Sequence, residues 1–147
     1  MHGFKFRYEN LLEVKQKYED VKKGKLNQAQ SKLESEKIYL TNLEMDQTNC
    51  HLHVASKMEM GVNVGHLKSY HTYLAGLKKT IDNQMVKIEK CNNEIITCRN
   101  ELIQASKEKK TFEKLKEKAK ETFYEEQKKE EANFIDQLVT FKNFSSN

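Results

Sequence analysis

The sequence predicts an all-α protein in which two long helices form an antiparallel coiled-coil hairpin, with the C-terminal helix longer than the N-terminal one. Three observations support this fold class. The 147 residues include no proline, which would interrupt a helix, and 33% of them are charged, which is too many for a compact core. A heptad repeat of apolar residues runs through the second half. The turn-forming residues gather near the middle, between two helical patterns.

The N-terminal helix is expected over about residues 5–58. The apolar row in its first part consists of Leu11, Val14, Tyr18 and Val21. After Gly24 the row continues at Leu26, Ala29, Leu33, Leu40, Leu43, Cys50 and Val54, with the polar residues Glu36 and Gln47 on the same line. Because the two rows are out of step, the sequence predicts that the heptad register slips near Gly24, as an inserted stutter would cause.

The connection between the helices is expected at about residues 59–66. This stretch contains Gly61 and Gly65 with Asn63 between them, and both residue types favour turns. Two long amphipathic helices that are joined by so short a connection become antiparallel neighbours. The chain is therefore predicted to form a single hairpin domain.

The C-terminal helix is expected over about residues 67–142, followed by a frayed tail at residues 143–147. One row of every seventh residue comprises Leu67, Leu74, Ile81, Ile88, Ile95, Leu102 and Lys109. The companion row, three residues further on, comprises Tyr70, Leu77, Gln84, Cys91, Cys98, Ala105 and Phe112. These rows form the a and d positions of a coiled-coil seam, in which Gln84 and Lys109 break the apolar pattern.

The two helices are expected to be unequal in length. If the residues on either side of the connection face each other, Phe4 pairs near residue 120, and about twenty residues extend past their partner, roughly 30 Å at 1.5 Å per residue. We expect this overhang to be covered by another protein, by self-association or by a folded-back tail. Its large apolar residues are Phe123, Tyr124, Phe134, Ile135, Leu138, Val139, Phe141 and Phe144.

Composition and motifs argue against most other function classes. The formal charge is +4, from 26 basic and 22 acidic residues that interleave, so no nucleic-acid-binding face is expected. No apolar stretch reaches the length of a membrane span and the N-terminus does not resemble a signal peptide, which predicts a soluble, cytoplasmic chain. The chain lacks nucleotide-binding and hydrolase motifs. We therefore expect neither an enzyme nor a cofactor nor a small-molecule substrate.

Three features remain to be interpreted. Four histidines lie around the connection near Cys50, but their spacing does not suit a metal site, so they are interpreted as polar tip residues: His51, His53, His66 and His71. The three cysteines form no CxxC motif and are interpreted as reduced seam residues. The lysine-rich run from Lys107 to Lys120 is either a solvated helix face or a patch for an acidic partner.

Several segments resemble the FliJ family, a small coiled-coil component of the bacterial flagellar protein-export apparatus. The opening reads FKFRYENLLEVKQKYEDVKKGKL from Phe4, and YHTYLAGLKKTIDNQ follows the connection from Tyr70. The basic segment FEKLKEKAKETFYEEQ begins at Phe112. Near the end, Ile135-Asp136-Gln137 departs from the acidic pair that the family usually shows there.

The resemblance implies a two-helix coiled coil similar to the central stalk of rotary ATPases. It further implies a non-enzymatic subunit, peripheral at the cytoplasmic face of the membrane. This subunit docks into the hexameric ring of the flagellar export ATPase, promotes its assembly or activity, and couples it to the membrane export gate and export chaperones.

The same resemblance suggests two partner-binding surfaces. The expected contacts with the ATPase ring are Phe4, Phe6, Leu11, Phe123, Phe134, Leu138 and Phe141. The expected contacts with the export gate are Tyr39, Leu43, Tyr70, Tyr73, Leu77 and Gln84. Tyr39 and Tyr73 lie just beside the apolar rows, where tyrosine either widens the buried strip or anchors a partner. The alternatives to an export subunit are a self-associating scaffold and a holdase-like chaperone.

Overall fold

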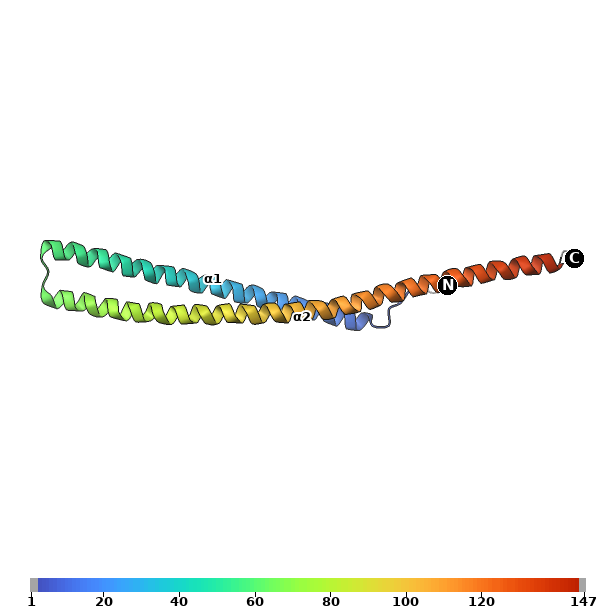
Figure 1. The fold of residues 1–147 in the computed structure, drawn as a ribbon, viewed down its shortest axis with the longest axis horizontal. Helices are drawn as coiled ribbons and strands as arrows, with labels where there is room; N and C mark the ends of the chain where they lie inside the picture. Colours follow the sequence, from blue (N-terminus) through green and yellow to red (C-terminus); the bar gives the residue numbers. More distant parts are fainter. Residues whose placement is uncertain (1–2, 146–147) are drawn as a thin grey trace. The chain divides into compact units, whose positions relative to one another are not determined.

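The computed structural model describes residues 3–145 and contains two α-helices (Figure 1). Helix α1 comprises Glu9–Met60 and helix α2 comprises Val64–Ser145, which are 52 and 82 residues long. The helices pack against each other in antiparallel directions, and the described residues contain no β-strand. The predicted fold class is therefore confirmed, including the longer C-terminal helix.

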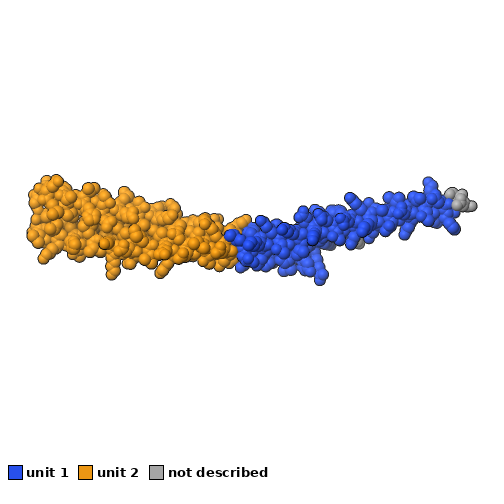
Figure 2. Space-filling model, viewed as in Figure 1, with its two compact units in different colours: residues 1–21, 103–147 blue, residues 22–102 orange. Residues whose placement is uncertain are grey.

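The chain divides into two compact units (Figure 2). Unit 1 comprises Met1–Val21 and Ile103–Asn147, and unit 2 comprises Lys22–Leu102. Each unit contains a segment of α1 packed on a segment of α2, so each has a seam of its own. The organisation as a single hairpin domain stays a prediction.

Residues 61–63 connect the two helices and reverse the chain. Helix α1 ends because Gly61 adopts a positive φ of 81°, a conformation that glycine reaches at little cost. Helix α2 begins at Val64 because the side-chain oxygen of Asn63 accepts a hydrogen bond of 2.9 Å from the Gly65 N–H. The connection is shorter than the expected 59–66 because Gly65 belongs to the first turn of α2.

The outer ends of the helices also differ from expectation by a few residues. Residues 3–8 precede α1, and the Glu9 N–H donates to the Phe6 carbonyl oxygen at 3.3 Å. Helix α2 continues through residues 143–145 of the expected tail, whereas residues 146–147 lie outside the described residues. Between residues 3 and 145, neither helix has a stretch that is both long and apolar enough to cross a membrane.

The seam of unit 2 is mostly apolar. Leu43, Leu77 and Ile81 form its core, and Leu40 packs against them. Along α2, every residue of the two predicted heptad rows from Leu67 to Phe112 is buried or half-buried, including the thiols of Cys91 and Cys98. The predicted rows are therefore confirmed as the side of α2 that packs on α1.

One polar pair lies within this apolar seam. Gln84 is only 4% exposed, and its Nε2 donates to the Glu36 carbonyl oxygen at 3.0 Å and to the Glu36 carboxylate. A buried amide without partners is costly, so the arrangement is favourable only when these two residues lie opposite each other. The pair therefore helps to fix the register between the helices, as single polar residues do in other coiled coils.

In unit 1, α1 contributes other residues to the seam than the sequence predicts. Its predicted apolar row is exposed, at 46% for Leu11, 58% for Val14, 47% for Tyr18 and 55% for Val21. Instead, Leu12 and Lys15 are half-buried and Glu19 is buried. These positions continue the spacing of three and four residues that α1 keeps after Gly24.

The predicted stutter is therefore wrong. The rows of α2 contain no stutter, and α1 has to keep the same spacing to stay in contact.

Charged side chains connect the two helical segments of unit 1. The Lys109 ammonium lies 3.2 Å from the buried carboxylate of Glu19. Lys116 lies 2.9 Å from Glu9, and Lys15 lies 2.9 Å from Glu108. The hydrogen bond to Glu19 raises the pKa of Lys109, and the hydrogen bond from Lys15 lowers the pKa of Glu108. The seam of unit 1 therefore depends on charge pairing more than the seam of unit 2 does.

Replacing Ile81 by Ala should lower the free energy of unfolding by about 2–4 kcal/mol, because it removes buried methyl groups and leaves a cavity. Ile81 is 6% exposed, whereas Ile96 on the same helix is 55% exposed. The matched change Ile96→Ala should therefore alter stability by less than about 0.5 kcal/mol. Urea unfolding followed by circular dichroism measures both values, and equal effects would contradict the assigned seam.

Acidification should destabilise unit 1 in part through Glu108. Its pKa lies below the ordinary value of 4.5 in the folded chain, so the stabilisation is present above that value and disappears as the pH falls through the lowered pKa. A Lys15→Met variant should show a smaller decrease in melting temperature between about pH 6 and pH 3. Lys17→Met, which changes an exposed lysine of the same helix, should behave like the parent chain. Identical pH profiles for the two variants would exclude this contribution of the pair.

Candidate functional site

The C-terminal part of α2 exposes many large apolar side chains. All of residues 128–145 are exposed. Phe134 is 62% exposed, Leu138 is 52% exposed and Phe141 is 71% exposed. A soluble helix rarely leaves so many large apolar groups in water. This segment, residues 128–145, is called the tail below.

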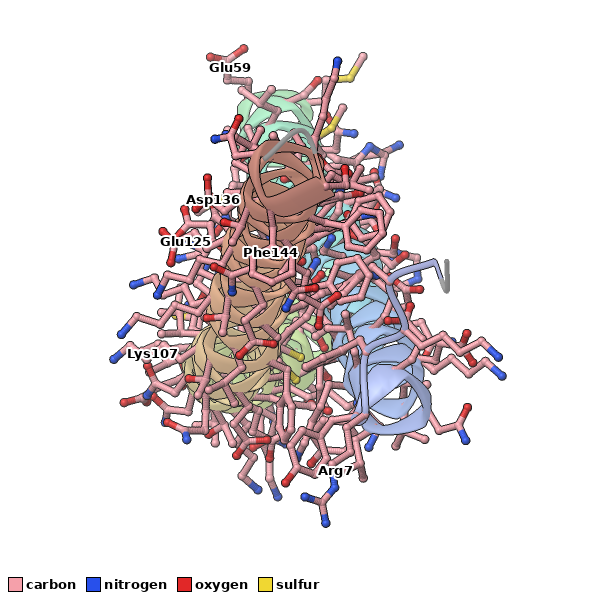
Figure 3. The ribbon with its side chains drawn as sticks, turned by 90° about the vertical axis from the view of Figure 1, so that its right-hand side faces the viewer. Arg7, Glu59, Lys107, Glu125, Asp136 and Phe144 are labelled. Atoms are coloured by element: carbon pink, nitrogen blue, oxygen red, sulfur yellow. The ribbon has the colours of Figure 1, made fainter. Side chains whose placement is uncertain are left out.

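The apolar residues of the tail have a definite orientation on the helix. At about 100° per residue, Phe134, Leu138 and Phe141 lie within about 60° of Phe123 around the helix axis. They lie on the opposite half of the helix from Glu125 and Asp136, which project from one side of α2 in Figure 3. Since the ring of Phe123 contacts Phe4, the tail continues the side of α2 that packs on the N-terminal segment. Phe134, Leu138 and Phe141 are called the tail stripe.

Aromatic residues gather where the N-terminal segment meets α2 in unit 1. The rings of Phe4 and Phe123 lie 5.7 Å apart between centroids, which places Phe4 three residues from its predicted partner at 120. The ring of Tyr8 lies 5.8 Å from Phe6 and 6.4 Å from Phe112. Phe4, Phe6 and Phe123 are half-buried in these contacts. Among the residues that are expected to contact the ATPase ring, Leu11 and the three residues of the tail stripe are therefore the exposed ones.

The expected gate contacts divide into exposed and buried residues. Tyr39 is 48% exposed and Tyr73 is 54% exposed. Tyr70 is half-buried, and its hydroxyl forms a hydrogen bond of 3.0 Å with the His53 ring. Leu43, Leu77 and Gln84 are buried in the seam of unit 2. The buried residues hold the helices together, so Tyr39 and Tyr73 are the ones that a partner can reach directly.

The lysine-rich run is also divided by the fold. Lys109 and Lys116 lie in the seam and pair with glutamates of α1. The other lysines of the run are exposed: Lys107, Lys110, Lys114, Lys118 and Lys120. Among the described residues, no three His, Cys, Asp or Glu side chains are placed to hold a metal ion.

Sequence reasoning missed the ion pairs of unit 1 and the exposure of the α1 row. The pairs could have been found by matching positions equally far from the connection, because Lys15 then falls opposite Glu108 and Glu9 opposite Lys116. The same matching would have placed Glu19 near Lys109, which looked like a break in the apolar row.

Comparison with known proteins shows the family of this chain. The family model described as "Flagellar FliJ protein" matches residues 4–147, which is nearly the whole chain. A Flagellar FliJ protein of Bacillus subtilis is 26% identical over 140 residues, which cover 92% of each chain. No solved structure matches significantly. The chain therefore belongs to the FliJ family, whose members are components of the flagellar protein-export apparatus.

Proposed function

We propose that this protein is a non-enzymatic subunit that docks into the ring of the flagellar export ATPase. There it promotes assembly or activity of the hexamer, and it couples the ring to the membrane export gate and to export chaperones. The observation that supports docking most directly is the tail stripe, an apolar surface that continues the packed side of α2 and is exposed in this chain.

The tail has the dimensions and chemistry of a docking element. Its 18 residues, 128–145, extend roughly 27 Å at 1.5 Å per residue. Apolar residues at positions i, i+4 and i+7 form the pattern by which one helix binds in a hydrophobic groove. The half-buried aromatic cluster around Phe4 and Phe123 lies at the base of the tail and holds it on the rest of unit 1. A ring of subunits can supply such a groove along its axis.

Binding alone is sufficient for the proposed effect on the ATPase. A ligand that binds the assembled ring better than separate subunits shifts the equilibrium towards the ring by its difference in affinity. The protein therefore needs no catalytic group of its own to increase ATP hydrolysis.

The second contact of the proposal is with the export gate. Exposed tyrosines carry much of the binding energy in many interfaces, because they combine a large apolar ring with a hydroxyl. Tyr39 and Tyr73 have this character, and the buried Leu43 and Leu77 keep the underlying helices together. Contact with the gate would place the protein at the cytoplasmic face of the membrane. The export chaperones complete the proposed set of partners.

Replacing the tail stripe by alanine should remove the stimulation of the export ATPase. The variant carries Phe134→Ala, Leu138→Ala and Phe141→Ala together, and we expect at least about a tenfold loss of apparent affinity for the ring, as for interface anchors. The matched control carries Ile135→Ala and Val139→Ala, which are similarly exposed but lie beside the stripe. ATP hydrolysis by the ATPase of the same organism, titrated with each chain, measures the effect.

The titration also tests the stoichiometry. Saturation well below one copy per ATPase subunit would agree with one copy per ring. Full stimulation by the alanine variant would contradict docking through the stripe. Light scattering tests the scaffold alternative. A dimer whose mass is independent of concentration, and which the alanine variant does not form, would favour a scaffold.

Replacing Tyr73 and Tyr39 by alanine should weaken binding to the cytoplasmic part of the export gate by about tenfold or more. The fold should be retained, because both side chains are about half exposed. Tyr124→Ala is a suitable control, since Tyr124 is 47% exposed but lies in unit 1. Calorimetric titration measures the affinities. Unchanged binding by the double variant would exclude these tyrosines from the gate contact.

A further inference from the structure

The seam of unit 2 is packed less closely near the connection than in its middle. In the middle, Leu77 and Ile81 of α2 are buried, at 8% and 6% exposure. Nearer the connection, Leu67 and Leu74 occupy the same heptad row as Ile81 but are only half-buried, and so is Val54 of α1. The two helices therefore leave apolar side chains partly uncovered at this end of the seam.

A groove of about 550 Å³ lies among these half-buried side chains. Its volume falls within the range of roughly 300–1,000 Å³ that small-molecule sites usually have. Along α2 it extends from residue 64 to residue 74, which is roughly 15 Å at 1.5 Å per residue. The groove therefore fits an elongated apolar ligand. Its apolar lining comes from both helices: Val54, Val64, Leu67, Tyr70 and Leu74.

The polar groups of the groove suit an anion. Lys68 and His71 also line it, whereas no carboxylate does so among the described residues. Both side chains are exposed, and neither forms an ion pair within residues 3–145. The Lys68 ammonium and the His71 ring can therefore both donate hydrogen bonds to a ligand. Cationic donors beside an apolar floor match an anionic head group on an apolar chain.

The net charge of the chain is concentrated in the segment that contains the groove. Residues 47–81 include four lysines, and Glu59 is the only acidic residue among them. Three of the four net positive charges of the whole chain therefore lie within these 35 residues. A local excess of positive charge attracts an anionic ligand and repels a cationic one.

We propose that the groove binds a fatty acid with a chain of about twelve carbons, the length that spans roughly 15 Å at roughly 1.3 Å per carbon. Lys68 and His71 hold the carboxylate. Helical side chains tilt towards the N-terminus of their helix, so the carboxylate lies at the connection and the alkyl chain extends towards Leu74. The proposal shares Tyr70 with the expected gate contacts, but it depends neither on those contacts nor on docking of the tail.

Binding of dodecanoate, a twelve-carbon fatty acid, to the isotope-labelled full chain tests the proposal. An NMR titration below the micellar concentration should show one saturable site per chain, with methyl shifts centred on Val54, Val64, Leu67 and Leu74. Dodecyltrimethylammonium, which has the same chain and a cationic head, should bind at least about tenfold more weakly. Hexanoate should bind at least about a hundredfold more weakly, because each buried methylene contributes to affinity.

Charge variants separate the contribution of the head group from that of the chain. Lys68→Gln with His71→Gln should weaken dodecanoate binding by about tenfold or more, and should not weaken binding of the cationic amphiphile. Because both side chains are exposed, the unfolding midpoint of the ligand-free chain should stay unchanged. The matched control, Lys78→Gln with Lys79→Gln, removes two exposed lysines of α2 that do not line the groove, and should bind like the parent chain.

Four results would overturn the proposal. They are the absence of saturable dodecanoate binding, equal affinity for the two head groups, equal weakening by the control variant, and shifts centred on the exposed apolar residues of the tail. Binding to phosphatidylglycerol vesicles without binding of monomeric dodecanoate would also overturn it, and would assign the basic segment to a lipid surface. Failure here would leave the ATPase titration with the tail variants unaffected, because those variants do not alter the groove.

Discussion

Because α2 repeats its packed positions at intervals of three and four residues without interruption, α1 has to present residues at the same intervals, whatever their chemistry. In unit 2 this requirement selects Leu40 and Leu43 and also the polar Glu36, which meets Gln84. In unit 1 it selects Leu12, Lys15 and Glu19. The position of the connection fixes which residues meet, so the apolar row that begins at Leu11 is excluded from the seam.

This constraint explains how far the sequence could be interpreted. The heptad rows of α2, the turn at Gly61 and the longer C-terminal helix follow from local periodicity and turn chemistry, and each was predictable. The stutter was predicted wrongly, because apolar periodicity was taken as the guide to the seam in a segment where ion pairs replace apolar contacts. A single helix does not reveal which of two adjacent faces is packed. That choice depends on the partner helix, which places Lys109 next to Glu19 and Lys116 next to Glu9.

The candidate binding surfaces were predictable to different degrees. The exposed tail follows from unequal helix lengths and needs no knowledge of side-chain contacts. The gate residues were chosen from a resemblance, and three of them are buried: Leu43, Leu77 and Gln84. Their positions on the heptad rows already indicated burial, whereas Tyr39 and Tyr73 lie just beside the rows. Membership of the FliJ family identifies the apparatus in which the protein works. The surface that binds each partner is determined by exposed side chains such as Tyr39 and Tyr73.

The polar seam of unit 1 has a consequence for how stability is distributed along the chain. Exposed ion pairs such as Lys15–Glu108 and Lys116–Glu9 contribute little to stability, and salt screens them. The apolar contacts in the buried core of unit 2 are not screened by salt. Local separation of the helices therefore costs least near the open end of the hairpin and most in unit 2. The segment that carries the exposed apolar surfaces is thus also the segment in which the two helices separate at the lowest free-energy cost.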